Sequence, residues 1–178
     1  MTISGTQLVA SMPHISPIRA ANMFPFLVKA MEEAEVNTPL RQAAFLAQLG
    51  HESCSLRYME EIASGEAYEG RADLGNTEPG DGPRYKGRGP IQLTGRNNYR
   101  ACGAALSLNL EGDPEQAAQP AVGFRVACWF WTKHKLNELA DQGPSKFDAI
   151  THVINGGQNG AEDRRARYAL ARAALAAG

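Results

Sequence analysis

The strongest constraint on the fold is a proline at the start of one apolar helical stripe after another. Ser16-Pro17 and Thr38-Pro39 each place a capping hydroxyl before a proline, and apolar residues then recur every three or four positions. Further apolar stripes begin at Pro120 and at Pro144. Strand patterns are weak, although two or three short strands near residues 84–94 fit the sequence. The chain is therefore predicted to be all-α, with at most a few short strands.

Individual residues predict where the expected helices begin, break and end. Pro25 lies inside the first one, where it removes a backbone N–H, and it predicts a break into two pieces. The helix that starts at Pro39 is expected to end near Glu52. Asp113-Pro114-Glu115-Gln116 resembles a capping box. Further helices are expected over residues 120–139, with Trp129 and Trp131 in the core, over 144–154 and over 161–177.

The length bounds the domain organisation. With 178 residues, the chain is long enough for a single catalytic domain, 1–178, and too short for a separate wall-binding module. We predict two helical lobes that flank a substrate cleft, built from residues 1–60 and 100–178, and a smaller loop-rich region over residues 61–99. Within that region, residues 70–82 are expected to form a long surface loop that borders the cleft, with disorder as the alternative.

Charge and composition exclude several partners and cofactors. A net charge of −1 gives no reason to expect nucleic-acid binding. No run of about 18 apolar residues predicts membrane insertion, and no export signal is visible, so we expect synthesis in the cytoplasm without a signal peptide. Cys54, Cys102 and Cys128 fit neither a zinc site nor a disulfide framework and are expected to be buried or partly buried free thiols. Because the sequence has no metal-ligand cluster and no nucleotide loop, we expect no metal and no cofactor.

Two glutamates nine positions apart, Glu52 and Glu61, indicate cleavage of a glycosidic bond. That reaction needs one carboxylic acid to protonate the leaving oxygen and one carboxylate to activate water or attack the sugar. In one continuous helix the two would lie on opposite sides, about 13.5 Å apart along the axis, so a shared cleft requires a break between them. A polar block over residues 85–95, rich in glycine, arginine and amides, follows and has no obvious use in a plain core.

Five motifs, in this order, resemble the family 19 glycoside hydrolases. They are His51-Glu52-Ser53, Glu61, the block from Tyr85 to Thr94 with Asn97-Asn98-Tyr99, Ile154-Asn155-Gly156-Gly157, and Asp163-Arg164. Within the family, the chain is most similar to the compact bacteriophage endolysins. The resemblance implies a mainly helical, lysozyme-like fold and an inverting mechanism, in which water attacks the anomeric carbon from the face opposite the leaving group.

The resemblance also implies a role for each matching residue. Glu52 would be the general acid and Glu61 the general base, while Thr94 takes the place of a serine that helps to hold the attacking water. Glu60 and Glu66 are the alternatives to Glu61 as the second acid. The amides that bind the sugar, and an arginine close to the acids, are matched by Gln92, Asn98, Asn155 and Arg164.

Other residues of these motifs leave alternatives open. Arg88 either contacts the sugar or anchors the polar block, because the donors of a guanidinium suit both tasks. Tyr85 and Tyr99 flank the block and are candidates for stacking on a sugar or for donating a hydroxyl to it. His51 is expected to support the position of Glu52 at the edge of the substrate site.

These observations predict an endolysin-like hydrolase that cuts β-1,4 bonds in the glycan strand of peptidoglycan and so lyses the bacterial cell wall. We expect a monomer that acts on the wall in the periplasm after release. Chitin oligosaccharides are the alternative substrate. A lytic transglycosylase would need one essential acid and would form an anhydro sugar, whereas a non-catalytic glycan-binding relative would need neither glutamate.

Overall fold

The computed structural model describes residues 2–177 and confirms the all-α prediction. Its helices are α1 (Gly5–Ser11), α2 (Pro17–Glu33), α3 (Pro39–Glu52), α4 (Asp81–Arg84), α5 (Arg96–Leu106), α6 (Pro120–Lys133), α7 (Leu136–Asp141), α8 (Phe147–Asn155) and α9 (Ala161–Ala176). Short 3-10 helices are η1 (Glu66–Tyr68), η2 (Ala72–Leu74), η3 (Pro114–Ala118) and η4 (Pro144–Lys146). The short strands expected near residues 84–94 are reduced to isolated antiparallel bridges that join Arg88 to Glu60 and to Leu93.

The predicted helix starts at Pro17 and Pro39 are confirmed. The Ser16 hydroxyl accepts the Arg19 N–H at 3.2 Å, and the Thr38 hydroxyl accepts the Arg41 N–H at 3.3 Å. Each hydroxyl thereby satisfies one of the N–H groups that the first turn of a helix leaves without a partner. These caps, with a proline directly after each, explain why both helices begin where the sequence predicts.

Two predicted helix boundaries are wrong. Helix α2 runs unbroken through Pro25, because its buried face continues on both sides of the proline. Pro25 has no N–H to donate to the Ala21 carbonyl, but both residues are exposed, so water can bind that carbonyl. The helix expected over residues 120–139 is two helices, α6 and α7. They are separated at Lys135, which takes a left-handed conformation with φ of 54°.

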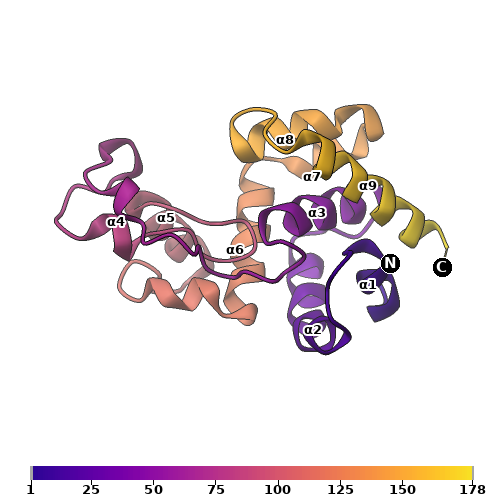
Figure 1. Cartoon of the computed structure of the whole chain (residues 1–178), viewed down its shortest axis with the longest axis horizontal. Helices are drawn as coiled ribbons and strands as arrows, with labels where there is room; N and C mark the ends of the chain where they lie inside the picture. Colours follow the sequence, from indigo (N-terminus) through magenta and orange to yellow (C-terminus); the bar gives the residue numbers. More distant parts are fainter. Residues whose placement is uncertain (1, 178) are drawn as a thin grey trace.

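The molecule is elongated, with α4 and α5 at one end and α1, α2, α3, α7, α8 and α9 at the other (Figure 1). Helix α6 lies between the two ends and packs against both α2 and α5. The predicted limit of the loop-rich region at residue 99 falls inside α5, so that region continues into this helix. No helix among residues 2–177 combines the length and the apolar character that crossing a bilayer requires.

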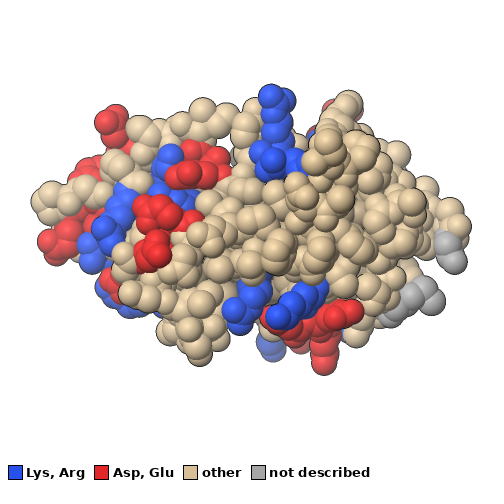
Figure 2. Space-filling model, turned by 90° about the horizontal axis from the view of Figure 1, so that it is seen from below, with Lys and Arg blue, Asp and Glu red and all other residues tan. Residues whose placement is uncertain are grey.

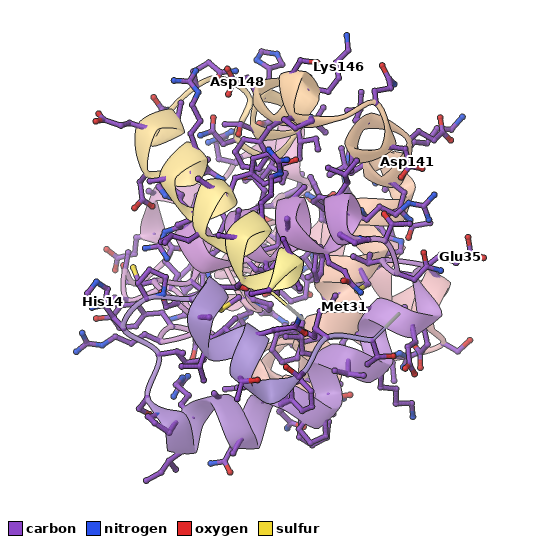
Figure 3. The ribbon with its side chains drawn as sticks, turned by 90° about the vertical axis from the view of Figure 1, so that its right-hand side faces the viewer. His14, Met31, Glu35, Asp141, Lys146 and Asp148 are labelled. Atoms are coloured by element: carbon purple, nitrogen blue, oxygen red, sulfur yellow. The ribbon has the colours of Figure 1, made fainter. Side chains whose placement is uncertain are left out.

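Helix α3 is the centre of the larger lobe. Every residue from 42 to 50 is buried, and α3 packs extensively against α9. The Phe45 ring meets Trp131 of α6 edge-on, with 5.1 Å between ring centroids. Arg41 binds both the Glu35 carbonyl and the Asp141 carboxylate, at 2.8 Å each. Glu35 and Asp141 lie on the same side of the view in Figure 3. Close packing therefore holds α3 in place, and with it the backbone of its last residue, Glu52.

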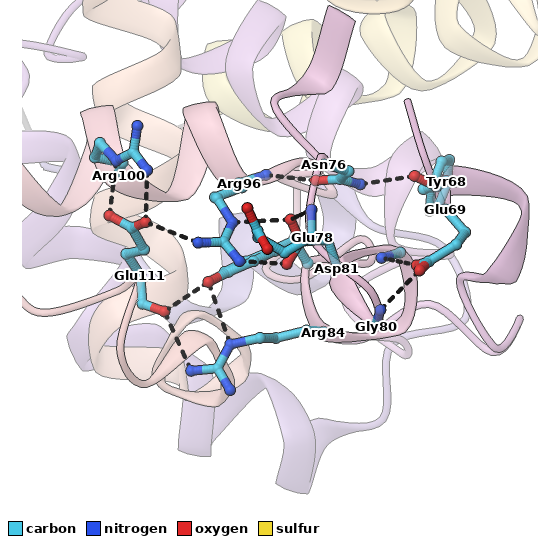
Figure 4. Close-up of polar contacts among 12 residues, drawn as sticks. Tyr68, Glu69, Asn76, Glu78, Gly80, Asp81, Arg84, Arg96, Arg100 and Glu111 are labelled. Carbon is cyan, nitrogen blue, oxygen red and sulfur yellow. Dashed lines mark hydrogen bonds and ion pairs between the residues drawn. The ribbon is translucent and has the colours of Figure 1, made fainter. Parts of the chain in front are cut away.

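Polar contacts organise the region expected to be a long loop. The fully buried Asn76 accepts the Arg96 N–H at 2.9 Å and donates to the Tyr68 carbonyl at 2.9 Å (Figure 4). Asp81 is also buried, and the hydrogen bond from the Arg96 guanidinium holds the pKa of its carboxyl below the ordinary value despite burial. Glu69 accepts the N–H groups of Gly80 and Gly82, at 2.7 Å each. Residues 70–82 therefore have a defined structure that includes η2 and the start of α4, and η1 lies just before them.

The cysteines are free, as predicted, but not all are buried. Cys102 and Cys128 lie in the core, where burial raises the pKa of the Cys102 thiol to about 12 and raises the pKa of Cys128 further. Cys54 is exposed, because it lies in the turn that follows α3. The expectation that all three are at least partly buried is wrong for Cys54.

Candidate active site

Glu52 is the last residue of α3, and the chain changes direction immediately after it. The next residue, Ser53, donates its hydroxyl to the Leu49 carbonyl at 2.6 Å and accepts the Leu56 N–H at 2.8 Å. Cys54, Ser55 and Leu56 follow with φ angles of 49°, 59° and 61°, a left-handed run that non-glycine residues rarely adopt. This turn supplies the break that a shared site for Glu52 and Glu61 requires.

Arg164 of α9 holds the Glu52 carboxylate. Its Nη2 lies 2.5 Å from Glu52 Oε1, its Nη1 donates to Gln48 Oε1 at 2.5 Å, and its Nε donates to the Asn159 carbonyl at 3.2 Å. The Arg164 side chain is 2% exposed, whereas that of Glu52 is 19% exposed. One oxygen of Glu52 is thus bound from inside the protein, and part of the carboxylate still faces solvent.

His51 contacts the protein rather than a substrate position. Its Nδ1 lies 2.6 Å from Asp163 Oδ2, and the same oxygen accepts Arg167 Nε at 2.7 Å. Burial acts to raise the pKa of Asp163, but the hydrogen bonds from Arg167 and His51 outweigh it, and the pKa lies below its usual value. A Cβ on Gly160 would come within 2.5 Å of the His51 ring, so the ring fills the space beside that glycine. His51 therefore joins the end of α3 to the start of α9.

Glu61 is bound through both carboxylate oxygens. Oε1 accepts the Tyr68 hydroxyl at 3.0 Å, and Oε2 accepts the Gly87 N–H at 3.0 Å. The Glu61 N–H also donates to the Gly87 carbonyl at 2.8 Å. Glu60 is used differently, because it forms ion pairs with Lys86 and Arg88. Both glutamates therefore bind the polar block, Glu60 through the charged side chains of Lys86 and Arg88 and Glu61 through the backbone N–H of Gly87.

Gly87 lies close to both the Glu61 carboxylate and Gln92. A Cβ at position 87 would lie 2.7 Å from Gln92 Oε1 and 3.1 Å from Glu61 Oε2. Only a residue without a side chain lets the backbone pass between the two groups. Glycine at this position therefore allows both the amide and the carboxylate to lie close to the backbone of the block.

Gln92, Thr94 and Asn98 are linked along the polar block. The Thr94 hydroxyl donates to the Gln92 carbonyl at 2.9 Å, and Asn98 Nδ2 donates to the Thr94 carbonyl at 2.8 Å. All three side chains are half-buried. The Thr94 oxygen, having donated its proton, keeps lone pairs that can accept a hydrogen bond from water.

The side chains of Tyr85 and Arg88 in the block, and of Tyr99 just after it, are buried and at most 4% exposed. Arg88 Nη1 donates to the Arg84 carbonyl at 2.8 Å, the Tyr99 hydroxyl donates to the Lys86 carbonyl at 2.7 Å, and the Tyr85 hydroxyl donates to the Glu111 carbonyl at 3.0 Å. The rings of Tyr85 and Tyr99 are covered by protein, so stacking of a sugar on either ring does not fit this structure. Arg88 has the contacts of an anchor.

Asn155 is the last residue of α8, and only the nitrogen of its side-chain amide has a hydrogen-bond partner among the described residues. Its Nδ2 donates to the Asn159 carbonyl at 2.7 Å, the same carbonyl that Arg164 contacts. Among the described residues, Asn155 Oδ1 is the one buried side-chain oxygen or nitrogen without a hydrogen-bond partner. A buried acceptor without a partner is costly, so this oxygen is suited to a donor on a ligand.

Sequence reasoning missed Tyr68, Gln48 and Thr151. Tyr68 lies in η1, and burial first, then its hydrogen bond to Glu61 and the charge of that carboxylate, raise the pKa of its hydroxyl. A lone tyrosine in a loop rich in small and charged residues was the available signal. Gln48 lies one helical turn before Glu52 and donates to the Thr151 hydroxyl at 2.8 Å. The helical period placed Gln48 near Glu52, but no pattern pointed to Thr151.

The site is therefore two clusters, one around Glu52 at the junction of α3, α8 and α9, and one around Glu61 at the polar block. A hollow of about 890 Å³ includes neither glutamate, although Tyr85 and Arg88 of the polar block contribute to its lining, with Asp81, Arg84, Arg96 and Glu111 among the others. Charged side chains crowd this end of the molecule (Figure 2). Among the described residues, no group of three or more histidine, cysteine, aspartate or glutamate side chains is placed to hold a metal ion.

An all-α fold that presents two separately held carboxylates, with amides beside each, fits the class of glycoside hydrolases. The chain belongs to glycoside hydrolase family 19, because residues 14–169 match the family described as chitinase class I.

Relatives differ in length from this chain. It is 38% identical over 161 residues to a basic endochitinase of Brassica napus, covering 85% of this chain and 55% of that protein. It is 29% identical to a glycosyl hydrolase family 19 domain-containing protein of Haemophilus influenzae, covering 86% of this chain and 94% of that protein. The chain therefore spans about half the length of the plant relative.

Solved structures share the fold. The structure of chitinase C from Streptomyces griseus has a TM-score of 0.76 and 26% identity, and the match covers 98% of this chain and 92% of that chain. A class IV chitinase of family 19 from Zea mays has a TM-score of 0.65 and 28% identity over 98% of this chain and 82% of that chain.

Proposed function

We propose that this chain hydrolyses β-1,4 bonds in a glycan of N-acetylated sugars by an inverting mechanism, with Glu52 as general acid and Glu61 as general base. The observation that carries the proposal is the way the two carboxylates are held. Glu52 is bound through one oxygen by Arg164, whereas Glu61 is bound through both oxygens by Tyr68 and Gly87. Two fixed carboxylates on separate elements are what protonation of a leaving oxygen and activation of water require.

The contacts support the division of roles. A general acid must present a protonated oxygen to the glycosidic oxygen, and the Arg164 contact orients Glu52 while leaving part of its carboxylate exposed. A general base must accept a proton from water, and each Glu61 oxygen keeps a lone pair after accepting one hydrogen bond. Thr94 is proposed to hold the attacking water, since its hydroxyl oxygen can still accept.

Substrate binding is proposed to involve the amides of both clusters. Asn155 Oδ1 lacks a protein donor, so the N–H of a sugar acetamido group or a sugar hydroxyl would complete its hydrogen bonding. Gln92 and Asn98 lie half-buried along the polar block and offer donors and acceptors to sugar hydroxyls. Asn155→Ala should therefore weaken binding of N-acetylated sugars more than it lowers the free energy of unfolding.

We propose peptidoglycan as the polymer, with chitin as the second candidate. In peptidoglycan, alternate sugars carry lactyl-peptide branches, which need room beside the chain. The proposal is supported by the burial of the aromatic rings that flank the polar block, since buried rings do not stand beside the half-buried polar side chains where such branches would lie. Chitin is favoured by the relatives, several of which are described as endochitinases. Release to the periplasm and lysis of the wall belong to the same proposal.

Mass spectrometry of the products distinguishes the candidates. Native protein, Glu52→Gln and Glu61→Gln are each incubated with purified peptidoglycan and with chitin oligosaccharides. Fragments of peptidoglycan with ordinary reducing ends, absent with either variant, are the expected result, and NMR of fresh products should show the inverted anomer. Cleavage of chitin alone would show that chitin, and not peptidoglycan, is the substrate. Anhydro ends that persist with Glu61→Gln would indicate a transglycosylase, and binding without products would indicate a non-catalytic relative.

A further inference from the structure

A chain of buried hydrogen bonds runs behind the Glu52 carboxylate and ends at Thr151 of α8. Thr151 Oγ1 accepts Gln48 Nε2 at 2.8 Å, Gln48 Oε1 accepts Arg164 Nη1 at 2.5 Å, and Arg164 Nη2 binds Glu52 Oε1 at 2.5 Å. Gln48 and Thr151 are fully buried, and Arg164 is 2% exposed. This series of hydrogen bonds therefore connects three helices, α3, α8 and α9, inside the protein.

The order of donors and acceptors in this chain has one consistent direction. A guanidinium only donates, so the Gln48 amide must present its oxygen to Arg164 and its nitrogen to Thr151. The Thr151 hydroxyl supplies the acceptor that this nitrogen needs in the interior. A flip of the amide would turn its nitrogen toward the guanidinium and place donor against donor, so Arg164 determines which way the amide faces. Without the Thr151 hydroxyl, the amide nitrogen would be buried without an acceptor, and the side chain would shift to find one. Thr151 thus holds the Gln48 side chain in place, and Gln48 holds one side of the Arg164 guanidinium.

We propose that Gln48 and Thr151 are positioning residues for the general acid, acting through Arg164 without touching the substrate. The inference rests on the proposed function of Glu52. Arg164 binds Glu52 with one nitrogen of a rigid planar group, so the direction of that nitrogen depends on where the other nitrogens are held. Removal of the Thr151 hydroxyl should let the guanidinium and the carboxylate move, which misplaces the proton donor.

Other contacts also hold these helices together. Phe147 of α8 stacks on Tyr168 of α9, with ring planes 3° apart and centroids 4.2 Å apart. Helix α3 is joined to α9 by apolar packing and by the contact of His51 with Asp163. The stacked rings and the contact of His51 with Asp163 do not involve Gln48 or Thr151.

The test compares Thr151→Val, which keeps the side-chain shape but removes the acceptor, with Thr151→Ser, which restores it. Thr151→Val should lower kcat on the polymer cleaved by the native protein on the order of tenfold, with KM little changed, because misplaced catalytic groups cost rate rather than binding. Thr151→Ser should recover most of the rate. Gln48→Met should lower kcat by a similar factor.

Ser11→Ala is the matched control, since Ser11 is a fully buried hydroxyl on α1 that bonds only to the Gln7 carbonyl of its own helix. Its kcat should equal that of the native protein. Thermal unfolding by circular dichroism shows that each variant is folded at the assay temperature, and Thr151→Ala replaces Thr151→Val if the latter does not fold.

Glu52→Gln measured in parallel separates the two proposals. If Glu52→Gln abolishes cleavage while the folded Thr151→Val and Gln48→Met variants keep native kcat, the positioning role is wrong and the role of Glu52 stands. If Glu52→Gln keeps native activity, the proposed function itself is wrong. A loss of rate in Thr151→Val that Thr151→Ser fails to restore would also overturn the positioning role.

Discussion

Replacement of Arg164 by lysine tests whether the shape of the guanidinium, and not only its charge, holds the active site. Arg164 donates through three nitrogens, to Glu52, to Gln48 and to the Asn159 carbonyl. A lysine ammonium is a compact charge on a flexible stem, so it is expected to follow Glu52 and to leave the buried Gln48 oxygen without its charged donor. Since a hydrogen bond to a charged group contributes about 1.5–3 kcal/mol, Arg164→Lys should lower the free energy of unfolding by about 2–3 kcal/mol.

Urea unfolding at neutral pH, followed by circular dichroism, measures this loss, and a thermal scan should show Tm lower by about 4–12 °C for a chain of this length. Arg165→Lys is the control, because Arg165 is the next residue on α9 and its ion pair with Asp148 is 57% and 47% exposed. Exposed pairs contribute little, so the control should unfold like the native protein. Equal stability of the two variants would refute the argument that the three-way contact of Arg164 matters.

Two further predictions concern the Glu61 cluster, and a third concerns Asp81 in α4. Tyr68→Phe removes a hydrogen bond worth about 1 kcal/mol and should lower kcat about fivefold in steady-state assays, with a Tm lower by about 2–4 °C. Gly87→Ala adds a Cβ 2.7 Å from Gln92 Oε1 and 3.1 Å from Glu61 Oε2, so both kcat and substrate affinity should fall, whereas Gly5→Ala, with open space around its Cβ, should leave kcat and affinity unchanged. Because Arg96 lowers the pKa of Asp81 in the folded state, its stabilising contribution is fully present above pH of about 4 and is lost as pH falls through the lower folded pKa. Acid titration of unfolding should therefore show a shallower loss of stability for Asp81→Asn than for the native protein.

Local signals in the sequence predicted most of the helices correctly. The Ser16 and Thr38 caps act within one turn, so they determine where α2 and α3 begin regardless of the rest of the fold. Pro25 misled because a proline is tolerated where the lost hydrogen bond lies on the solvent side and the buried face continues past it. The split at Lys135 has no proline or glycine to mark it, since the left-handed residue there is a lysine.

The candidate site was predictable where its residues lie in motifs and not where partners come from distant helices. Glu52 and Arg164 lie in recognisable motifs, although the sequence could not show that the two bind each other directly. Thr151 is 103 positions from Gln48, and no local pattern links a buried hydroxyl on one helix to an amide on another. Tyr85 and Tyr99 illustrate the opposite error, because aromatic residues beside a polar block resemble sugar platforms, yet both are buried.

The two proposed catalytic carboxylates rest on unequal supports, and this difference determines what can change their separation. Glu52 ends a helix whose residues 42–50 are all buried, so packing holds it in place. Glu61 lies in a segment joined to the polar block by the isolated bridge between Glu60 and Arg88, and Arg88 continues through a second bridge to Leu93. The separation of the carboxyl groups decides between an attacking water and a direct attack on the sugar. Because one carboxylate is fixed by apolar packing and the other by a few polar contacts, shifts in that separation should originate in the polar block.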